Sequence, residues 1–517
     1  MHCLSYLLAA AVLCNGLSSV TAKPDETSLI ERDGSLYNVF EHGATGVKIE
    51  YVNNSAICET TLGVKHISGY LSVGEQQDLF FWFFEARNSP ATAPLAAWFN
   101  GGPGASSMIG LFGENGPCRI QVHDDRIPRA TTANNTFSWN NNVNMLYIDQ
   151  PFGAGFSRGD PLVNSTDSAA PYQRDKISKP ISLIALGINN GWHDAVLQYR
   201  AYIEFAYNNP YKPFIDDVGY KSMYDAFNND CFPVLDNCGF TESYNFTESN
   251  QPCKFAHYIC QRVFWDPLVE RLKDIGRDIY DIRQPYQADP FADIRDYLDQ
   301  GDIRMAIGAK EWEAESKDIE DEFKTTGDFV RSYLKWLSEI VSSGVNTIIW
   351  VGDADFSCNW NGVYDVSNHI LYPGSAKFST QLLEPYLVNG KEAASFKTVY
   401  NLSFMKVFNA GHFVPHDQPE LALQVFEQMM LNGTVGHARV RLRKYLSNTN
   451  HLIDLNVFNV ILVQDKDDEW LAFLPRRRYR LDVVTDLKMV IKGDLVLSRS
   501  AALYGLRNTL EKLAARC

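Results

Sequence analysis

The sequence predicts an α/β fold built around a largely parallel sheet, and two repeated patterns support this. Short apolar runs end in loops that are rich in glycine or asparagine, and helical stretches lie between the runs. The four runs span residues 94–99, 143–148, 181–186 and 345–350. Buried parallel strands have continuous apolar sequences, and reacting groups collect beyond their carboxyl ends. The loops after these runs are therefore the first place to look for a functional site.

Two further segments complete the expected main domain, which we place at residues 23–436. Residues 68–72 and 79–84 are typical of two antiparallel strands joined by a polar turn. A stretch rich in aromatic residues and cysteine, about 198–300, predicts a helical insertion that caps the strand ends. Single α/β domains of this size are common, so the length of 517 residues does not require several domains.

The composition changes near Gly436. Residues 437–517 contain 15 Lys and Arg against 9 Asp and Glu, whereas the whole chain has a formal charge of -15. This tail is either a small appended module or translated sequence that does not belong to the fold. We favour the second interpretation, because the tail adds no recognisable motif.

The N-terminus indicates entry into the secretory pathway. An apolar stretch from Leu4 to Val12 precedes the small-residue site Val20-Thr21-Ala22, which predicts a signal peptide over residues 1–22. The stretch is too short to span a bilayer, which takes about 20 residues. We expect a secreted or vacuolar glycoprotein. Its possible glycosylation sites are Asn53, Asn134, Asn164, Asn245, Asn401 and Asn432.

Cysteine usage agrees with an oxidising compartment. Cys231, Cys238, Cys253 and Cys260 fall within 30 residues and have no zinc-finger spacing. They predict a local disulfide cluster whose connectivity stays open.

Charge and histidine spacing exclude several function classes. The net charge of -15 argues against nucleic acid and anionic membranes as partners. His412 and His416 flank a proline and would not share a helix face, so we expect no metal site. No cofactor is indicated, and the oligomeric state stays open.

Two loops supply candidates for acid–base chemistry. Asp353 and Asp355 follow the apolar run that ends at Trp350, and His412 follows the short run Met405–Phe408. A hydrolase of the α/β type carries its nucleophile, acid and histidine in that chain order, each on a loop after a strand. An acid in this position can orient an imidazole and stabilise its protonated form.

Six motifs give the chain a specific resemblance. They are WFNGGPGASS, FGENGPC, NMLYIDQPFGAGFS, GINNGW, VGDADFSCNW and NAGHFVPHDQP. Together they resemble the serine carboxypeptidases, the fungal secreted branch most closely, over about residues 58–433. The resemblance implies an α/β-hydrolase-type fold and hydrolysis of C-terminal peptide bonds through an acyl-enzyme, with peptide or protein C-termini as substrates.

The resemblance also implies residue roles. Asp355 matches the triad acid and His412 the triad base. The backbone amides of Gly101 and Gly102 match donors to the oxyanion. Asn100 and Glu114 match residues that grip the substrate carboxylate, with Trp98 behind them. A neutral glutamate beside that carboxylate implies a preference for acidic pH, since two charged carboxylates would repel.

The family's nucleophile segment is missing from this sequence. In the family, a block of the form ESYGG or ESYAG lies between the motif that contains DQP and GINNGW. Here residues 167–172 resemble the start of the preceding helix, and residues 173–180 lead directly to the later strand. A helix, the nucleophile strand, its turn and the next helix would need roughly fifty residues. The sheet is therefore expected to be incomplete around the nucleophile strand.

No other serine fills this role. Gly155-Phe156-Ser157-Arg158-Gly159 has the G-x-S-x-G pattern, but Asp160-Pro161 begins a polar loop where a helix should start. Ser106 and Ser107 are better interpreted as the start of a helix.

Three interpretations remain open at this stage. In the first, the gene encodes a full carboxypeptidase whose serine segment was lost by exon skipping or a faulty gene model. In the second, the chain is a catalytically dead family member. An acyltransferase of the same family would share the triad.

Overall fold

The computed structural model describes residues 25–32, 35–43, 46–74, 76–121, 130–169, 182–238 and 250–436, and the backbone of five short strands nearer the C-terminus. The chain divides into two compact units, Met1–Val435 and Gly436–Cys517. The predicted signal peptide and the sequon at Asn245 lie outside the described residues.

The first sheet is mostly antiparallel and has eight strands in the order β1-β2-β3-β4-β5-β9-β6, with β10 paired to β5. Among these pairs, β6 and β9 run parallel. The strands are β1 (Glu26–Arg32), β2 (Ser35–Glu41), β3 (Lys48–Asn53), β4 (His66–Gly74), β5 (Gln77–Phe84), β6 (Leu95–Trp98), β9 (Asn144–Ile148) and β10 (Arg158–Gly159). The predicted hairpin is β4 and β5.

The second sheet has five strands in the order β11-β12-β15-β14-β13. Its first three strands are parallel, and the last two are antiparallel. The strands are β11 (Ala185–Asn189), β12 (Asn346–Gly352), β13 (Glu384–Val388), β14 (Lys391–Val399) and β15 (Leu402–Val407). A separate hairpin pairs β7 (Cys118–Gln121) with β8 (Thr131–Asn134).

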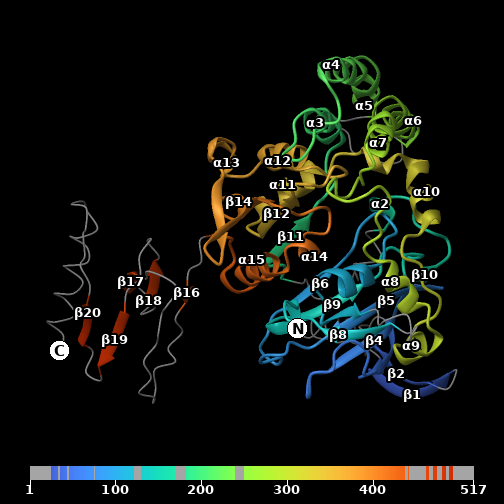
Figure 1. Cartoon of the computed structure of the whole chain (residues 1–517). Coiled ribbons are helices and arrows are strands. Elements are labelled where there is room, and N and C mark those ends of the chain that lie inside the picture. Colours follow the sequence, from blue (N-terminus) through green and yellow to red (C-terminus); the bar gives the residue numbers. More distant parts are fainter. Residues whose placement is uncertain are drawn as a thin grey trace, which may run out of the picture. The chain divides into compact units, whose positions relative to one another are not determined.

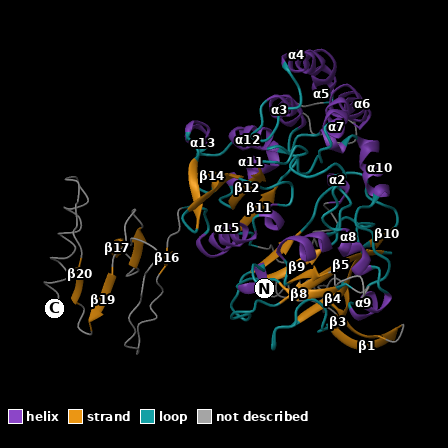
Figure 2. Cartoon of the chain, viewed as in Figure 1, coloured by secondary structure: helices purple, strands orange, loops and turns teal. Residues whose placement is uncertain are grey.

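Short helices fill the connections of the first unit (Figures 1 and 2). Near the first sheet lie α1 (Ser107–Ile109), the π-helical turn η1 (Gly110–Asn115), η2 (Trp139–Asn141) and α2 (Thr166–Ala169). The insertion carries α3 (Ala195–Tyr207), α4 (Asp217–Ala226), η4 (Phe227–Cys231), α5 (Phe232–Asn237), α6 (Asn250–Cys260), η5 (Gln261–Trp265) and α7 (Asp266–Asp274). The later helices are α8 (Ala292–Leu298), α9 (Gly301–Ala306), α10 (Lys317–Thr326), η6 (Asp328–Val330), α11 (Leu334–Ser342), α12 (Trp360–His369), α13 (Ser375–Thr380), α14 (Val414–Asp417) and α15 (Pro419–Asn432).

The prediction of one largely parallel sheet was wrong in part. Among the described strands, parallel pairing is found between β6 and β9 and among β11, β12 and β15, and β6 and β11 each end a separate sheet. The third apolar run is also displaced: residues 182–184 precede the strand, which begins at Ala185. Asn-rich residues that we assigned to a loop, up to Asn189, belong to β11 because they pair with β12.

The strand β6 was expected to be buried and is not. Leu95 on β6 is 60% exposed, and Ile184, directly before β11, is 54% exposed. Among the described residues, no strand pairs with the outer edge of β6 or of β11. Apolar side chains at two such edges would be covered if one more strand lay between them.

One hydrophobic core nevertheless joins the two sheets. It contains Trp82 and Tyr147 from the first sheet together with Met405 and Val407 from the second. Trp139 contacts both sides, because its ring lies 5.3 Å from that of Trp98 and 6.2 Å from that of Trp350. The unpaired edges therefore belong to one packed body.

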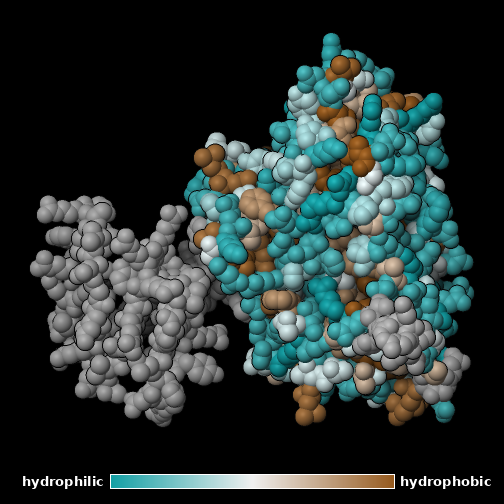
Figure 3. Space-filling view, viewed as in Figure 1, coloured by the Kyte–Doolittle hydropathy of each residue, from teal (hydrophilic) through white to brown (hydrophobic). Residues whose placement is uncertain are grey.

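The insertion is helical and packs around a hydrophobic cluster of its own. Helices α3–α7 lie together at the top of Figure 1 around a cluster that includes Phe205, Phe264 and Phe356. Disulfides Cys231–Cys260 and Cys238–Cys253 join these helices, and Cys58–Cys118 lies near the first sheet. Apolar side chains are exposed over α4–α6 (Figure 3), including Val218, Phe232, Phe255 and Tyr258.

In the C-terminal unit the structure describes five short strands: β16 (Val440–Arg441), β17 (Ile461–Gln464), β18 (Trp470–Phe473), β19 (Arg480–Val484) and β20 (Lys488–Lys492). Antiparallel pairs join β16 to β18, β17 to β18 and β19 to β20. In the part of the chain that the structure describes, we find no helix with the length and apolar character needed to cross a membrane.

Candidate active site

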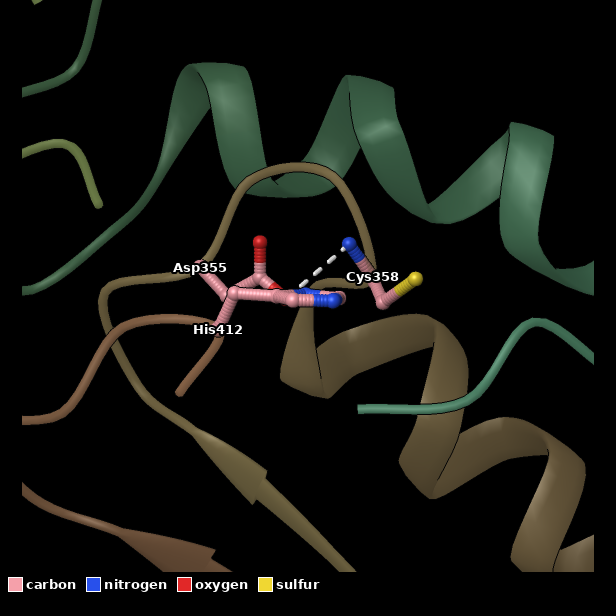
Figure 4. A group of neighbouring side chains, drawn as sticks. All are labelled: Asp355, Cys358 and His412. Carbon is pink, nitrogen blue, oxygen red and sulfur yellow. Dashed lines mark hydrogen bonds and ion pairs between the residues drawn. The ribbon is translucent and has the colours of Figure 1, made fainter. Parts of the chain in front are cut away.

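Asp355 and His412 form a hydrogen-bonded pair. The Nδ1 atom of His412 lies 2.8 Å from Oδ2 of Asp355. Asp355 lies in the loop after β12, and His412 lies in the loop after β15. Because β12 and β15 are parallel neighbours, both loops leave the same edge of the sheet. The two residues that the motifs single out are therefore brought together by strand pairing (Figure 4).

The Asp355 carboxylate is buried and is held mainly through one oxygen. Besides the bond to His412, Oδ2 accepts hydrogen bonds from Asn190 Nδ2 at 2.7 Å and from the backbone N–H of Cys358 at 3.2 Å. Oδ1 has no hydrogen-bond partner among the described residues. The carboxylate is thus fixed in orientation, with one oxygen committed to the imidazole.

The backbone of His412 is held at two points. Its N–H donates to the carbonyl of Tyr280 at 2.8 Å, and its carbonyl accepts from Asn189 Nδ2 at 2.9 Å. Burial of the ring opposes its charging, but Asp355, followed by Glu114 and Glu315, outweighs burial and raises the pKa of His412. The imidazole is therefore suited to accept and hold a proton.

The residues expected to grip a substrate carboxylate form a hydrogen-bonded chain. Trp98 Nε1 donates to Asn100 Oδ1 at 2.6 Å, and Asn100 Nδ2 contacts Glu114 Oε1 at 3.3 Å. A Cβ atom on Gly110 would lie 2.1 Å from Trp98 Nε1, so this close approach requires glycine. Gly101 and Gly102 are exposed in the adjoining turn.

Glu114 is buried, and it interacts with Asn100 through a hydrogen bond and with His412 through its charge. Burial raises the pKa of Glu114 to about 7, although the bond from Asn100 and the nearby His412 favour its charged form. Its second oxygen has no partner among the described residues. A carboxyl that stays neutral in weak acid can donate a hydrogen bond to an anionic ligand.

The serines considered from the sequence all have structural contacts. Ser157 Oγ accepts from the N–H of Phe80 and donates to the carbonyl of Asp149, each at 2.7 Å. Ser106 caps α1 by accepting from the N–H of Met108, which confirms the predicted helix start. Ser107 Oγ accepts from the N–H of Asn100. We find no hydrogen bond from these hydroxyls to His412.

Sequence reasoning missed Asn189, Asn190 and Cys358. Their signals were present, because the motifs GINNGW and VGDADFSCNW contain all three. Cys358 is buried and free, and burial, followed by the Asp355 charge, raises the pKa of its thiol. In Figure 4 the thiol points away from the Asp355 carboxylate.

Oxygen, sulfur and nitrogen atoms of Asp355, Cys358 and His412 lie within 4.8 Å of one another. Such atoms could hold a metal ion. The hydrogen bonds to Asp355 already account for this cluster, however, and we assign no metal to it.

Comparison with known proteins identifies the family. A family model described as Serine carboxypeptidase matches residues 57–171 and 169–432. The chain belongs to the serine carboxypeptidase family. Enzymes of this family are serine-type carboxypeptidases, which hydrolyse C-terminal peptide bonds, and their substrates are peptides.

Individual relatives agree with the family match. Carboxypeptidase S1 from Penicillium janthinellum is 43% identical over 430 residues, which cover 74% of this chain and 98% of that protein. Carboxypeptidase S1 homolog A from Trichophyton rubrum is 31% identical over 516 residues, covering 76% of this chain and 78% of that protein. A prohormone-processing carboxypeptidase from Saccharomyces cerevisiae has a similar fold, with a TM-score of 0.59 and 18% identity. That match covers 79% of this chain and 94% of the yeast chain.

The same comparisons show that this chain has fewer residues than the Penicillium protein over the aligned region. Because 74% of 517 residues is about 383, about 47 of the 430 positions aligned with the Penicillium protein have no residue of this chain opposite them. The two matched pieces of the family model meet at residues 169–171. The size of this difference is close to the roughly fifty residues that the missing elements would need.

Proposed function

We propose that this serine carboxypeptidase uses Asp355 and His412 as the acid and base of its triad. The observation that carries the proposal is the 2.8 Å contact between Asp355 Oδ2 and His412 Nδ1. An acid that binds Nδ1 leaves the other ring nitrogen available for proton transfer and stabilises the imidazolium that forms. Any serine delivered to this ring would meet a base that is already oriented.

The turn near Asn100 supports the rest of the reaction. His412 takes the proton of the serine hydroxyl as the oxygen attacks the carbonyl carbon, and backbone N–H groups of Gly101 and Gly102 stabilise the oxyanion. The protonated His412 then gives its proton to the departing amine. Water attacks the acyl-enzyme in the second half, again through His412, and releases the shortened peptide and the free serine.

We assign recognition of the substrate C-terminus to Asn100 and Glu114. The amide and a neutral glutamate can both donate hydrogen bonds to a carboxylate. The pKa of Glu114, about 7, keeps it largely neutral in acid, which supports a preference for acidic pH. Above that pH the ionised glutamate would repel the substrate carboxylate.

We further propose that the active polypeptide contains an additional segment between Tyr172 and Ile181. Its strand would lie between β6 and β11 and cover Leu95 and Ile184. Its carboxyl end would place a serine beside His412. This proposal explains why apolar residues are exposed at both edges.

A chimera tests both proposals. The segment of the Penicillium protein that has no counterpart here would be inserted after Tyr172, and both forms would be secreted from a fungal host. Release of C-terminal residues from peptides would be followed by mass spectrometry at pH 4 to 8. We expect hydrolysis by the chimera in acid, and at least a 10³-fold loss in its His412→Ala variant. An inactive but folded chimera would contradict the assigned roles.

An experiment on the unmodified chain tests the alternative that it is a catalytically dead family member. The structural hydrogen bonds of Ser106, Ser107 and Ser157 favour this alternative for the chain as it stands. A fluorophosphonate probe should leave it unlabelled, and labelling at any serine would exclude the dead form. Sequencing the transcript across residues 172–181 shows directly whether extra codons are present.

The remaining sequence-based assignments are also proposals. We propose that the chain enters the secretory pathway, because three disulfides need an oxidising compartment to persist. We propose residues 23–436 as the enzyme domain and 437–517 as a basic C-terminal extension.

A further inference from the structure

Two neighbouring asparagines at the end of β11 contact both members of the acid–base pair. Asn189 Nδ2 donates to the backbone carbonyl of His412, and Asn190 Nδ2 donates to Oδ2 of Asp355. The two amides come from a third strand, which pairs in parallel with β12. The acid and the base are thus tied to a strand that carries neither of them.

Asn190 has the more constrained environment of the two asparagines. It is 3% exposed, and its backbone N–H continues the pairing with β12 by donating to the carbonyl of Trp350. Its Oδ1 accepts from the N–H of Gly352 at 3.3 Å, while its Nδ2 donates to Asp355 at 2.7 Å. The side chain therefore fixes the distance between the end of β12 and the carboxylate that follows it.

The backbone of Asn190 also restricts which residue can do this. Its φ is +44°, in the left-handed region that asparagine, aspartate and glycine tolerate best. Of these three, only asparagine offers both a donor for a carboxylate and an acceptor for a backbone N–H. The conformation and the two bonds point to the same residue.

We propose that Asn190 is a positioning residue that holds the Asp355 carboxylate in the orientation required to bind His412 Nδ1. Without it, Oδ2 keeps only the N–H of Cys358 and the imidazole itself. Because Oδ1 has no described partner, rotation of the carboxylate would meet little resistance. Asn189 secures the main chain of His412 in the same assembly.

The inference rests on the proposed roles of Asp355 and His412, but its test needs no hydrolysis. The purified chain is studied by NMR, which follows the far-downfield Nδ1–H resonance of His412 and the pKa of its ring. His412→Gln assigns both signals. Asp355, Glu114 and Glu315 are the charged groups that act on this ring in the wild type.

Asn190→Gly removes the amide and keeps a residue that suits the left-handed backbone. We expect the downfield resonance to broaden or disappear and the pKa of His412 to fall by about one pH unit, because the carboxylate no longer faces the ring. Asn190→Asp keeps size and backbone preference but replaces the donor by an oxygen. In this variant we expect the resonance to move and the pKa of His412 to rise, because a second negative charge is added.

Asn209→Ala is the matched control. Asn209 is 9% exposed, and its amide donates to the carbonyls of Phe205 and Lys212 rather than to Asp355 or His412. It should lower the melting temperature without moving either His412 signal. If it moves them as much as Asn190→Gly does, they report general loosening and the proposal fails.

Unchanged His412 signals in Asn190→Gly would also overturn the proposal. If that variant does not fold, the downfield resonance in Asn190→Asp decides, and an unmoved resonance in that variant overturns the proposal. A failed chimera with intact NMR effects would refute the proposed function alone.

Discussion

Glu114 should make this protein more stable in acid than at neutral pH. Burial raises the pKa of Glu114 from its ordinary 4.5 to about 7 in the folded protein. A folded-state pKa above the unfolded one stabilises the protein below pH 4.5, and this contribution is lost as the pH rises through 7. At about 1.4 kcal/mol per pH unit, the full contribution is on the order of 3 kcal/mol.

Glu114→Gln isolates that contribution. Glutamine resembles the protonated acid, so the variant should match the wild type at pH 4 and exceed its unfolding free energy at pH 8 by about 3 kcal/mol. Burial also raises the pKa of Asp149, to about 6, but this residue titrates equally in both proteins and cancels from the difference.

Urea unfolding followed by tryptophan fluorescence at pH 4, 6 and 8 would measure the effect. Glu339→Gln, at an exposed position on α11, serves as the control for the chemical change from glutamate to glutamine. A Glu114→Gln effect of the same size at pH 4 and pH 8 would refute the reasoning, because it would show that the carboxyl has the same pKa in the folded and unfolded states.

Three further predictions concern stability and modification. Arg283 binds the carboxylates of Asp281 and Asp417, so Arg283→Met should lower the unfolding free energy by about 1–3 kcal/mol in urea titrations. Arg283→Lys should recover only part of the lost stability. An unchanged urea midpoint for Arg283→Met would contradict this prediction. Removing the disulfide Cys238–Cys253, which closes a 15-residue loop, should cost roughly 3 kcal/mol, seen as a lower melting temperature, and an unchanged melting temperature would contradict this. Enzymatic glycan release in heavy-oxygen water labels each asparagine that carried a glycan. It should label the exposed Asn53 and not Asn401, because Asn401 Nδ2 donates to the carbonyls of Val341 and Val345. A label at Asn401 would show that these hydrogen bonds do not form in the secreted protein.

The order of motifs along the chain was enough to propose the acid–base pair. Asp355 and His412 each follow an apolar run, and parallel pairing of β12 with β15 brings them within 2.8 Å. Such local patterns are readable because a buried strand and the turn after it depend mainly on neighbouring residues. The missing serine segment was equally visible, as an interval too short for the elements it should contain.

Long-range contacts could not be read in this way. Asn190 donates a hydrogen bond to a carboxylate 165 positions away in the sequence, and its neighbour Asn189 donates one to a carbonyl 223 positions away. Cys358 looked like one of several cysteines, and only the structure shows that its backbone N–H supports Asp355. The division into two sheets was also hidden, because strand order depends on pairing between distant segments.

By itself, then, the sequence supplied the family motifs and the proposals for the acid, the base and the missing nucleophile segment, because each is a local pattern. Only the tertiary structure decided which groups orient Asp355 and how strongly burial perturbs Glu114. It also showed that no strand among the described residues pairs with the outer edges of β6 and β11. These properties depend on which distant segments fold against one another and on how much water they exclude.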